Sequence, residues 1–422
     1  MTLLMLTKYF PYGTGEAFIE NEISEFAKQY DKIYIIACEV QKDETYVRTV
    51  PENVMYFRVP AKCKSIQKVR DMICGISNIF SLDSEFKNEL GACNAIKQKL
   101  FLAYFEAKSK RIYRSIMKLG IIDEIEHGSY VLYSYWLFTT ARVGILISKQ
   151  KKPRYMISRA HGYDLYEYRN SIKYLPFRKL FLEKYNLILP CSNDGTRHIQ
   201  EKYQNYLNKV ETAYLGTLDN GIGKYSTDGV FRIVSCSRIS SEKRVEKILE
   251  ALSLIKEKKI FIEWTHIGDG CGLEKLKKDA SSLPNNISVS FIGNLPNKKV
   301  LEFYKNNKVD LFINVSSSEG LPVSIMEAIS FGIPVIATDV GGTSEIVIND
   351  LNGILIKKDF RSNELAKKIV LFEKYKSDER YLEYRVQCRK YWENNFMALH
   401  NYKYLCLKIE NNIKDLMSRK EI

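Results

Sequence analysis

The chain has 422 residues, of which 64 are Lys or Arg and 50 are Asp or Glu, so its formal net charge is +14. Because single hydrophobic cores rarely grow beyond roughly 250–300 residues, this length predicts two domains. With 45% hydrophobic and 12% aromatic residues, the composition excludes wholesale disorder. More of the positive charge falls before Leu215 than after it, which leaves nucleic acid, an anionic membrane surface and phosphorylated substrates open as partners.

Nine cysteines are scattered along the chain without a CxxC pair or a zinc-finger spacing, a pattern that fits a reducing compartment. The apolar start of the chain is interrupted by Lys8 and by the turn at Pro11–Gly15. We therefore expect neither a signal-peptide core nor a membrane span there. The prediction is a cytoplasmic protein, with peripheral contact to the inner face of the cell membrane as an alternative.

The first half of the chain is predicted to be a doubly wound α/β domain. Residues 2–7 (TLLMLT) form a short apolar run without alternation, typical of a strand buried on both faces of a parallel sheet. A glycine turn at Tyr12–Glu16 and a helical pattern from Phe18 follow, and Asp31–Cys38 supplies the next strand, which completes a βαβ unit. Further strands are expected at 130–133, 155–158 and 187–190.

A basic helical region is predicted between Phe86 and Leu119. From Lys97 to Lys118 it holds seven basic residues and one acid, Glu106, beside a periodic set of apolar residues. Two interpretations stay open: a solvated face over a core stripe, or contact with an anionic lipid surface or a phosphorylated acceptor.

The second half repeats the pattern after a stretch rich in Gly, Asp, Ser and Thr. Strands are expected at 231–236, 261–267, 287–292, 311–315 and 334–338, with helices at 245–256 and from Leu273, Val300 and Leu321. The predicted domains are 1–215, a linker at 216–229, a second doubly wound domain at 230–378, and C-terminal helices at 379–422 that pack back on the first domain. Two such domains joined by a hinge predict a ligand cleft where the carboxyl ends of their sheets face one another.

The segment 316–327 (SSSEGLPVSIME) follows a predicted strand and opens a helix. Its two glutamates, Glu319 and Glu327, are carboxylates that can each accept hydrogen bonds from a pair of hydroxyls. Gly320 and Leu321 are expected to present backbone N–H groups at the start of the helix, where negative charge is favoured.

Two cations, Arg238 and Lys243, stand in the loop that follows the strand at 231–236. On one loop at the carboxyl end of a strand they can clamp a diphosphate and neutralise the charge of a leaving group. The alternative is a pair of exposed surface cations.

These motifs, together with 327–337 (EAISFGIPVIA) and 341–347 (GGTSEIV), resemble the retaining glycosyltransferases with two Rossmann-like domains, the GT-B, family-4 type. The resemblance implies that Glu319 and Glu327 bind the donor sugar and its nucleoside and that Arg238 and Lys243 hold the diphosphate. Arg244 departs from the pattern, because a glycine commonly follows the lysine in this family. The predicted donor-binding residues are Gly13, Gly15, Arg238, Lys243, Gly293, Glu319, Gly320, Leu321 and Glu327.

His161 lies at the end of the strand 155–158, beside Gly162 and Asp164. The family has a histidine here, which implies a contact to the sugar or help with a proton; the alternative is a structural histidine. Tyr163 and Asp164 are weaker candidates for contact with an acceptor. Two interpretations of Gly13 and Gly15 stay open. They form a plain tight turn, or, as the resemblance implies, a glycine-rich loop that lets the donor diphosphate or the acceptor approach the backbone. The predicted catalytic residues are His161, Arg238, Lys243 and Glu319.

The function expected from the resemblance is transfer of a sugar, with retention, from a nucleoside-diphosphate sugar to a hydroxyl of a glycan or lipid-linked acceptor. The pathway would build a capsule, an exopolysaccharide or a lipopolysaccharide. We find no Asp-x-Asp motif and no His/Cys cluster, so neither a metal nor another cofactor is expected. A nucleotide-sugar epimerase of the same fold is the alternative. A basic nucleic-acid-binding protein is a more distant one, because no nucleic-acid-binding pattern is found, and nucleic acid is not expected as a partner. The presence of both glutamates and both cations argues against an inactive scaffold.

Overall fold

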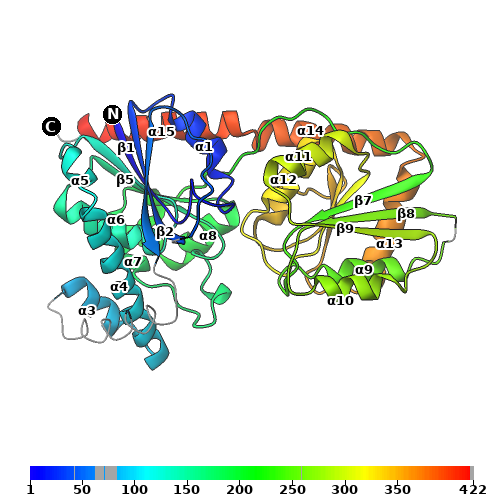
Figure 1. The fold of residues 1–422 in the computed structure, drawn as a ribbon, viewed down its shortest axis with the longest axis horizontal. Helices are drawn as coiled ribbons and strands as arrows, with labels where there is room; N and C mark the ends of the chain where they lie inside the picture. The colour runs from blue at the N-terminus through cyan, green and yellow to red at the C-terminus, as the bar shows by residue number, and fades with distance from the viewer. Residues whose placement is uncertain (42, 62–70, 72–82, 258, 419–422) are drawn as a thin grey trace. The chain divides into compact units, whose positions relative to one another are not determined.

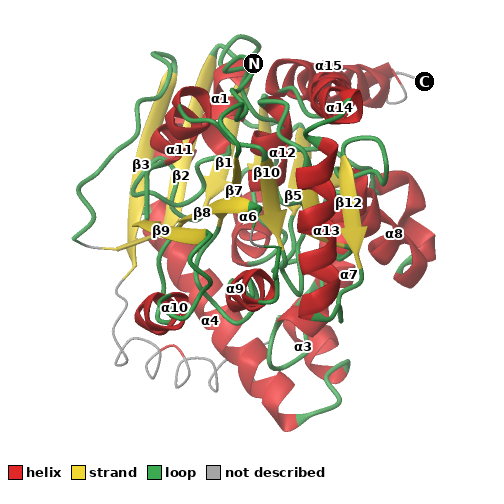
Figure 2. Ribbon diagram, turned by 90° about the vertical axis from the view of Figure 1, so that its right-hand side faces the viewer, coloured by secondary structure: helices red, strands yellow, loops and turns green. Residues whose placement is uncertain are grey.

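The computed structural model describes residues 1–41, 43–61, 71, 83–257 and 259–418 (Figure 1). The chain divides into two compact units: Met1–Tyr214 together with the chain from Tyr402 onward, and Leu215–Asn401. Each unit contains a six-stranded sheet whose paired strands run parallel, with helices on both faces (Figures 1 and 2). The predicted α/β class with two doubly wound sheets is therefore confirmed. Cys63 and Cys74 lie outside the described residues.

The sheet of the first unit has the order β3-β2-β1-β4-β5-β6. Its strands are β1 (Thr2–Thr7), β2 (Lys32–Gln41), β3 (Val54–Ala61), β4 (Tyr130–Ser134), β5 (Tyr155–Ala160) and β6 (Leu187–Pro190). Its helices are α1 (Ile19–Phe26), α3 (Ser84–Gly91), α4 (Ile96–Met117), α5 (Ile121–Glu124), α6 (Thr139–Gln150), α7 (Arg178–Lys184) and α8 (Asn193–Lys202), with 3-10 turns at Glu167–Arg169 and Gln204–Lys209. Strand β3 was not predicted, because it lies at the edge of the sheet and carries Arg58 and Pro60 in place of a continuous apolar run.

Side chains of β1 alternate between two separate cores, which is why this strand is apolar at every position. Leu4 and Leu6 pack with residues of α4 and α6 on one face. Leu3 and Met5 pack with α1 and with the helix α15 (Ala398–Ser418) on the other. A strand covered on both faces cannot carry the alternating polar pattern of a half-exposed one.

The predicted basic helix is α4, and half of its six basic residues form ion pairs with described residues of the first unit. Leu102, Phe105, Ile112 and Ile116 are buried in the core. On the polar side, three of its basic residues form ion pairs: Lys108 with Glu39, Lys110 with Glu106, and Arg111 with Asp71. These contacts favour the interpretation of a solvated face over a core stripe.

The sheet of the second unit has the order β12-β11-β10-β7-β8-β9. Its strands are β7 (Val230–Cys236), β8 (Phe261–Ile267), β9 (Ile287–Gly293), β10 (Leu311–Asn314), β11 (Val335–Thr338) and β12 (Gly353–Ile356). Its helices are α9 (Glu246–Ser253), α10 (Leu273–Ala280), α11 (Asn297–Asn306), α12 (Val323–Ser330), α13 (Ser362–Tyr375) and α14 (Glu379–Asn395), with a 3-10 turn at Gly341–Glu345. The short edge strand β12 was not predicted.

The strand order places a topological switch point in each sheet. In the first unit, β1 lies between β2 and β4; in the second, β7 lies between β8 and β10. At such points the connections leave the sheet in opposite directions, which opens a crevice outside the carboxyl ends of the two central strands.

Two predicted boundaries are wrong. Residues 216–229 are not a free linker: Gly223 N donates to Phe331 O over 2.9 Å and Ser226 N to Asp310 over 2.8 Å, within the second unit. Helix α14 also belongs to the second unit, where Trp392 donates to Thr217. Only α15 enters the first unit, because its apolar side chains Leu405 and Ile409 are part of that unit's core.

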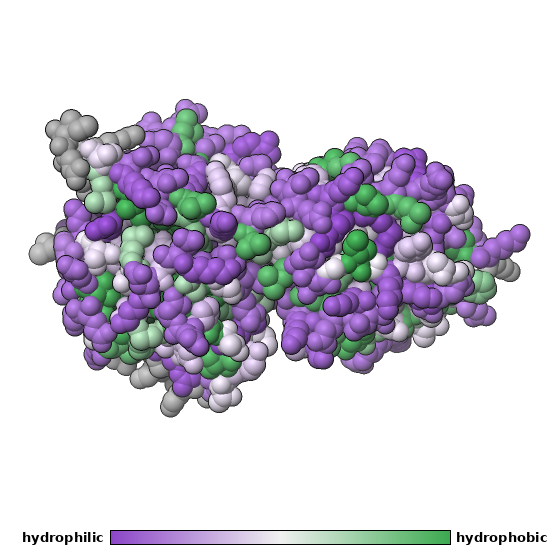
Figure 3. All heavy atoms as spheres, turned by 90° about the horizontal axis from the view of Figure 1, so that it is seen from above, coloured by the Kyte–Doolittle hydropathy of each residue, from purple (hydrophilic) through white to green (hydrophobic). Residues whose placement is uncertain are grey.

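The surface seen in Figure 3 is mostly hydrophilic, with hydrophobic residues scattered over it. None of the helices in the described part of the chain combines the length and the apolar character that a bilayer crossing requires.

We expect Glu22→Ala to destabilise the first unit by roughly 3–5 kcal/mol. Glu22 and Arg159 are both buried, and the carboxylate accepts from Arg159 Nε at 3.1 Å and from the hydroxyls of Tyr133 and Tyr135. The substitution leaves the guanidinium in the core without its carboxylate. Urea unfolding measures the effect, with Glu25→Ala on the same helix as the control; an equal loss in both variants would contradict the expectation.

Candidate functional site

The loops that follow β7 and β10 are joined at the switch point of the second unit. Ser317 N donates to Glu242 O over 2.7 Å, and Lys243 Nζ lies 2.5 Å from Glu319 Oε1. Asn314 Nδ2 approaches the same glutamate oxygen at 3.3 Å. A cation and a carboxylate from segments 76 residues apart therefore meet where a doubly wound sheet binds its ligands.

Arg244 fixes the loop that carries Lys243. Its φ is +50°, the left-handed region in which glycine is favoured, so the backbone keeps a glycine-like conformation although the residue is arginine. The side chain compensates: it donates to the carbonyl oxygens of Val315 and Lys358 at 2.8 Å and of Ser316 at 3.2 Å. Arg244 thereby ties the two loops together.

Substitution of Arg244 should separate the two effects of this residue. Arg244→Ala loses three hydrogen bonds and keeps the backbone strain, so we expect it to destabilise the second unit by roughly 2–3 kcal/mol. Arg244→Gly loses the same bonds without the strain and should be about 1 kcal/mol more stable than the alanine variant. Thermal and urea unfolding test this; equal stabilities would show that the backbone conformation costs nothing.

Glu327 lies on α12 and is buried. Asn297, the first residue of α11, donates its side-chain N–H to Glu327 Oε1 over 2.6 Å. Burial raises the pKa of Glu327 to about 7, although the hydrogen bond from Asn297 acts in the opposite direction. The carboxyl group is therefore partly protonated at neutral pH.

The structure places the other predicted residues of this unit as follows. The helix α12 begins at Val323 after Pro322, so Gly320 and Leu321 precede it and do not form its first turn as predicted. Gly320 O accepts instead from Gly342 N at 2.8 Å. Gly293 ends β9 with φ +81°, and Arg238 is exposed and forms no ion pair with a described residue.

Four further polar residues of this region were not predicted. Asn297 and Asn314 contact the two glutamates, and the hydroxyls of Ser240 and Ser318 are buried without a hydrogen-bond partner among the described residues. Ser240 and Ser318 lie within the two motifs, so their position beside the predicted residues could have identified them as site residues. Nothing in the sequence marks Asn297 in this way.

His161 follows β5 in the first unit, packed against three aromatic rings. Its ring centroid lies 4.6 Å from that of Trp136 and 5.4 Å from that of Tyr135. Burial, with the nearby Arg159, lowers the pKa of His161 to about 3, so the ring is neutral near pH 7. Its Nε2 is buried and has no hydrogen-bond partner in the described part of the chain, which leaves this nitrogen available to a ligand.

The two residues after Gly162 differ in their surroundings. Asp164 is fully buried, and its carboxylate accepts from His161 N and Leu137 N, both at 2.7 Å. It holds the loops after β4 and β5 together. Tyr163 is 45% exposed and lines a pocket, so of the pair it is the one placed to meet a ligand.

The carboxylate of Glu16 closes the loop that contains Gly13 and Gly15. Glu16 accepts from the backbone N–H groups of Lys8, Tyr9 and Phe10, at 3.2, 2.6 and 2.6 Å, and from the indole of Trp136. Gly13 has φ +67°, and a Cβ there would meet Glu44 at 2.8 Å. The amides that follow β1 are thus already bound to an anion, Glu16 itself, which sequence reasoning missed.

No three His, Cys, Asp or Glu side chains come together in a possible metal site within the described ranges.

Residues 224–394 match the family model described as glycosyl transferases group 1. The match covers most of the second unit and includes Arg238, Lys243 and both glutamates. The second unit is therefore similar to the glycosyl transferases group 1.

Curated proteins that are similar to this chain match over a limited length. An O-antigen biosynthesis glycosyltransferase, WbnH of Escherichia coli, is 33% identical over 127 residues, 30% of this chain and 33% of that protein. The GtfA subunit of a peptide N-acetylglucosaminyltransferase of Streptococcus agalactiae is 29% identical over 175 residues, 40% of this chain and 33% of that protein. The chain thus spans about a third of the length of these two relatives.

Solved structures match over both units. HepE of Anabaena in complex with UDP has a TM-score of 0.65 at 15% identity, covering 97% of this chain and 100% of that one. A sucrose-phosphate synthase of Thermosynechococcus elongatus has a TM-score of 0.69 at 13% identity, covering 99% and 100%. At these identities the likeness shows the fold, and it confirms the predicted GT-B class.

Proposed function

We propose that this glycosyltransferase transfers a sugar from a nucleoside-diphosphate sugar to a hydroxyl of a glycan or lipid-linked acceptor, with retention of the anomeric configuration. The observation that carries the proposal is the contact between Lys243 and Glu319 at 2.5 Å, at the switch point of a unit that matches the family. Support comes from UDP in the HepE structure and from relatives named for O-antigen and lipopolysaccharide synthesis.

In this proposal the second unit binds the donor. Lys243 and Arg238 hold the diphosphate, Glu319 accepts hydrogen bonds from sugar hydroxyls, and Glu327 accepts them from the ribose. The diphosphate competes with Glu319 for Lys243, so donor binding exchanges an internal ion pair for a pair with the ligand. Because two cations neutralise the charge of the leaving group, the proposal includes no metal.

Transfer forms the bond from the acceptor oxygen to the anomeric carbon and breaks the bond from that carbon to the diphosphate oxygen. The hydroxyl proton moves to the departing diphosphate, which leaves with the bonding electron pair. The acceptor attacks from the face that the leaving group vacates, which retains the configuration. His161 is neutral, and its Nε2 has no hydrogen-bond partner in the described part of the chain; it is proposed to hydrogen bond the transferred sugar.

A panel of nucleotide-sugars tests the proposal. We expect release of nucleoside diphosphate from one or a few donors, faster with a membrane extract than without it and unchanged by EDTA. The anomeric coupling in the NMR spectrum of the product reports retention. Binding of no nucleotide-sugar by calorimetry would overturn the proposal, and so would epimerised donor formed without an acceptor.

A further inference from the structure

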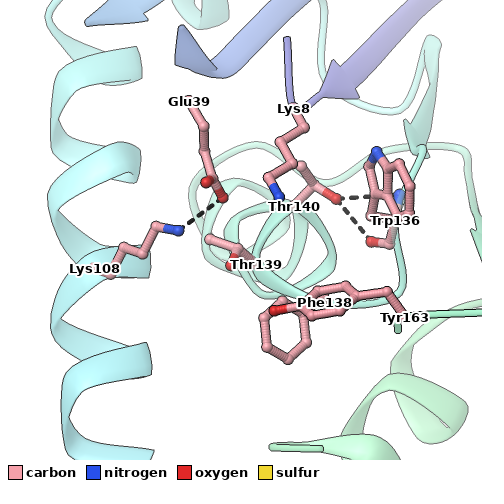
Figure 4. Close-up of a pocket in the computed structure, with 8 residues that line it drawn as sticks. All are labelled: Lys8, Glu39, Lys108, Trp136, Phe138, Thr139, Thr140 and Tyr163. Atoms are coloured by element: carbon pink, nitrogen blue, oxygen red, sulfur yellow. Dashed lines mark hydrogen bonds and ion pairs between the residues drawn. The ribbon is translucent and has the colours of Figure 1, made fainter. Parts of the chain in front are cut away.

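A small pocket lies at the switch point of the first unit (Figure 4). It collects residues from the end of β2 and from the loops that follow β1, β4 and β5. Its lining residues are Lys8, Glu39, Lys108, Trp136, Phe138, Thr139, Thr140 and Tyr163. This is the position at which a doubly wound sheet binds its ligand, and none of these residues except Tyr163 was predicted as a site residue.

The pocket has a net positive charge. Glu39 Oε1 pairs with Lys108 Nζ at 2.8 Å, which leaves the charge of Lys8 in excess. Lys8 Nζ lies 5.2 and 5.6 Å from the ring centroids of Tyr9 and Tyr163. Burial acts to lower the pKa of Lys8, but Glu39 and the two tyrosines outweigh it and the pKa is raised, so this lysine stays protonated.

Helix α6 begins at the pocket, with Thr139 as its first residue. The first amide groups of a helix have no partner within the helix and favour an anion. Thr139 is only 3% exposed, and its Oγ1 has no hydrogen-bond partner among the described residues. A buried hydroxyl without a partner is costly, and here it lines a cavity that carries positive charge.

Aromatic side chains form the remaining walls. Trp136, Phe138 and Tyr163 surround the polar groups, and the rings of Phe138 and Tyr163 meet edge to face at 5.3 Å. Aromatic faces beside hydroxyls and a lysine suit a sugar unit better than a free inorganic ion, because a pyranose has apolar C–H faces and polar edges.

We propose that this pocket binds a compact oxyanion, a carboxylate or a phosphate, carried by the acceptor of the glycosyltransferase. Lys8 and the start of α6 hold the anion, the Thr139 hydroxyl donates to it, and the three aromatic residues bound the sugar that bears it. Lys108 contributes when the ligand displaces Glu39. This assignment rests on the proposed function, and it predicts that acidic acceptors are preferred over neutral ones.

Titration of the full chain with glucuronate, glucose 6-phosphate and glucose tests the proposal by calorimetry and by the fluorescence of Trp136. We expect saturable binding of one or both acidic sugars and at least about tenfold weaker binding of glucose. Lys8→Met should weaken the acidic ligand about tenfold, and the matched control Lys28→Met, in the turn that follows α1, should leave it unchanged. The fluorescence change should disappear in Trp136→Phe.

Thr139→Val separates a ligand role from a structural one. Because the hydroxyl has no hydrogen-bond partner among the described residues, its replacement by a methyl group should leave the unfolding temperature unchanged or higher while weakening the acidic ligand several-fold. Equal binding of glucose and glucuronate would overturn the assignment, as would equal effects of Lys8→Met and Lys28→Met. The panel of nucleotide-sugars is a separate experiment. Failure to bind a nucleotide-sugar would contradict the proposed function but would not change the outcome of the titrations with glucuronate, glucose 6-phosphate and glucose.

Discussion

Lys243→Ala and Glu319→Ala should each lower kcat/KM for the nucleotide-sugar by roughly 10³-fold. Lys243 lies in the loop that is proposed to bind the donor diphosphate, and Glu319 is its ion-pair partner at 2.5 Å. Without Lys243, the charge that develops on the leaving diphosphate is left to Arg238 alone. Without Glu319, the sugar loses its carboxylate acceptor, so both losses are expected mainly in kcat.

Two controls distinguish this loss from damage to the fold. Lys247→Ala removes a lysine four residues away on α9, which pairs with Glu250 at the surface, and should leave kcat/KM within about twofold. Glu319→Gln keeps the shape and one acceptor oxygen and should retain more activity than the alanine variant. Wild-type turnover of Lys243→Ala with an intact unfolding transition would overturn the donor site.

Strands at the centre of each sheet were predictable because burial on both faces leaves an uninterrupted apolar run. Thr2–Thr7 and Leu311–Asn314 are such strands, and the loops that follow them carry predicted site residues. The edge strands β3 and β12 lacked that signal: Val54–Ala61 includes an arginine and a proline, and Gly353–Ile356 is four residues long. Edge position alone does not remove the signal, because the other two edge strands, β6 and β9, were predicted; the polar residues of β3 and the shortness of β12 account for the two that were missed.

Contacts between distant segments could not be predicted from the sequence. Glu16 binds the indole of Trp136 across 120 residues, and Asn297 binds Glu327 across 30. Both depend on which strand ends the sheet order brings together, and that order is a property of the whole fold. The motifs located Glu319 and Lys243, but not the asparagines and serines that surround them.

Arg244 illustrates the limit of reading a motif by residue type. This chain has an arginine where the pattern it resembles commonly has a glycine, yet the residue has φ +50°, in the region that favours glycine. Three hydrogen bonds to carbonyl groups offset the strain. Arg244 thus has a glycine-like backbone conformation, and its side chain also joins the loops that follow β7 and β10.

Donor affinity should rise with pH through about pH 7 because of Glu327. An ionised carboxylate accepts hydrogen bonds from two ribose hydroxyls, whereas in the protonated form one of its oxygens carries a hydrogen and acts as a donor. Burial holds the pKa of Glu327 at about 7, so below that value we expect the donor Kd to increase by up to roughly tenfold per pH unit. Glu327→Ala should weaken the donor by roughly 100-fold at pH 8.

The other groups near this carboxylate do not titrate in the same range. Burial raises the pKa of Cys236 to about 12 and that of Tyr304 well above its usual value, and it lowers the pKa of His266 to about 4. Asn297 has no charge to lose. A transition in donor affinity near neutral pH is therefore assigned to Glu327.

Stability should change with pH in the opposite direction. The pKa of Glu327 is raised from 4.5 in the unfolded chain to about 7 in the folded one, so between these values the folded state binds more protons than the unfolded state. The contribution of protonated Glu327 to the free energy of unfolding is fully present below about pH 4.5. It is lost, by roughly 2–3 kcal/mol, as pH rises through 7. Glu327→Gln, which cannot ionise, should lack this loss and be the more stable protein at pH 8.

Asn297→Ala provides the decisive comparison. Its amide favours the ionised carboxylate at 2.6 Å, so its removal should shift the transition in donor affinity to higher pH without abolishing it. Calorimetric titration of the donor from about pH 5.5 to about pH 8.5 measures both variants beside the wild type. A pH-independent Kd in the wild type, or an unshifted transition in Asn297→Ala, would show that Glu327 does not control donor binding in this way. The same carboxylate thus makes donor binding stronger and the unliganded fold weaker as pH rises, because the charge that the ribose requires is the one that burial opposes.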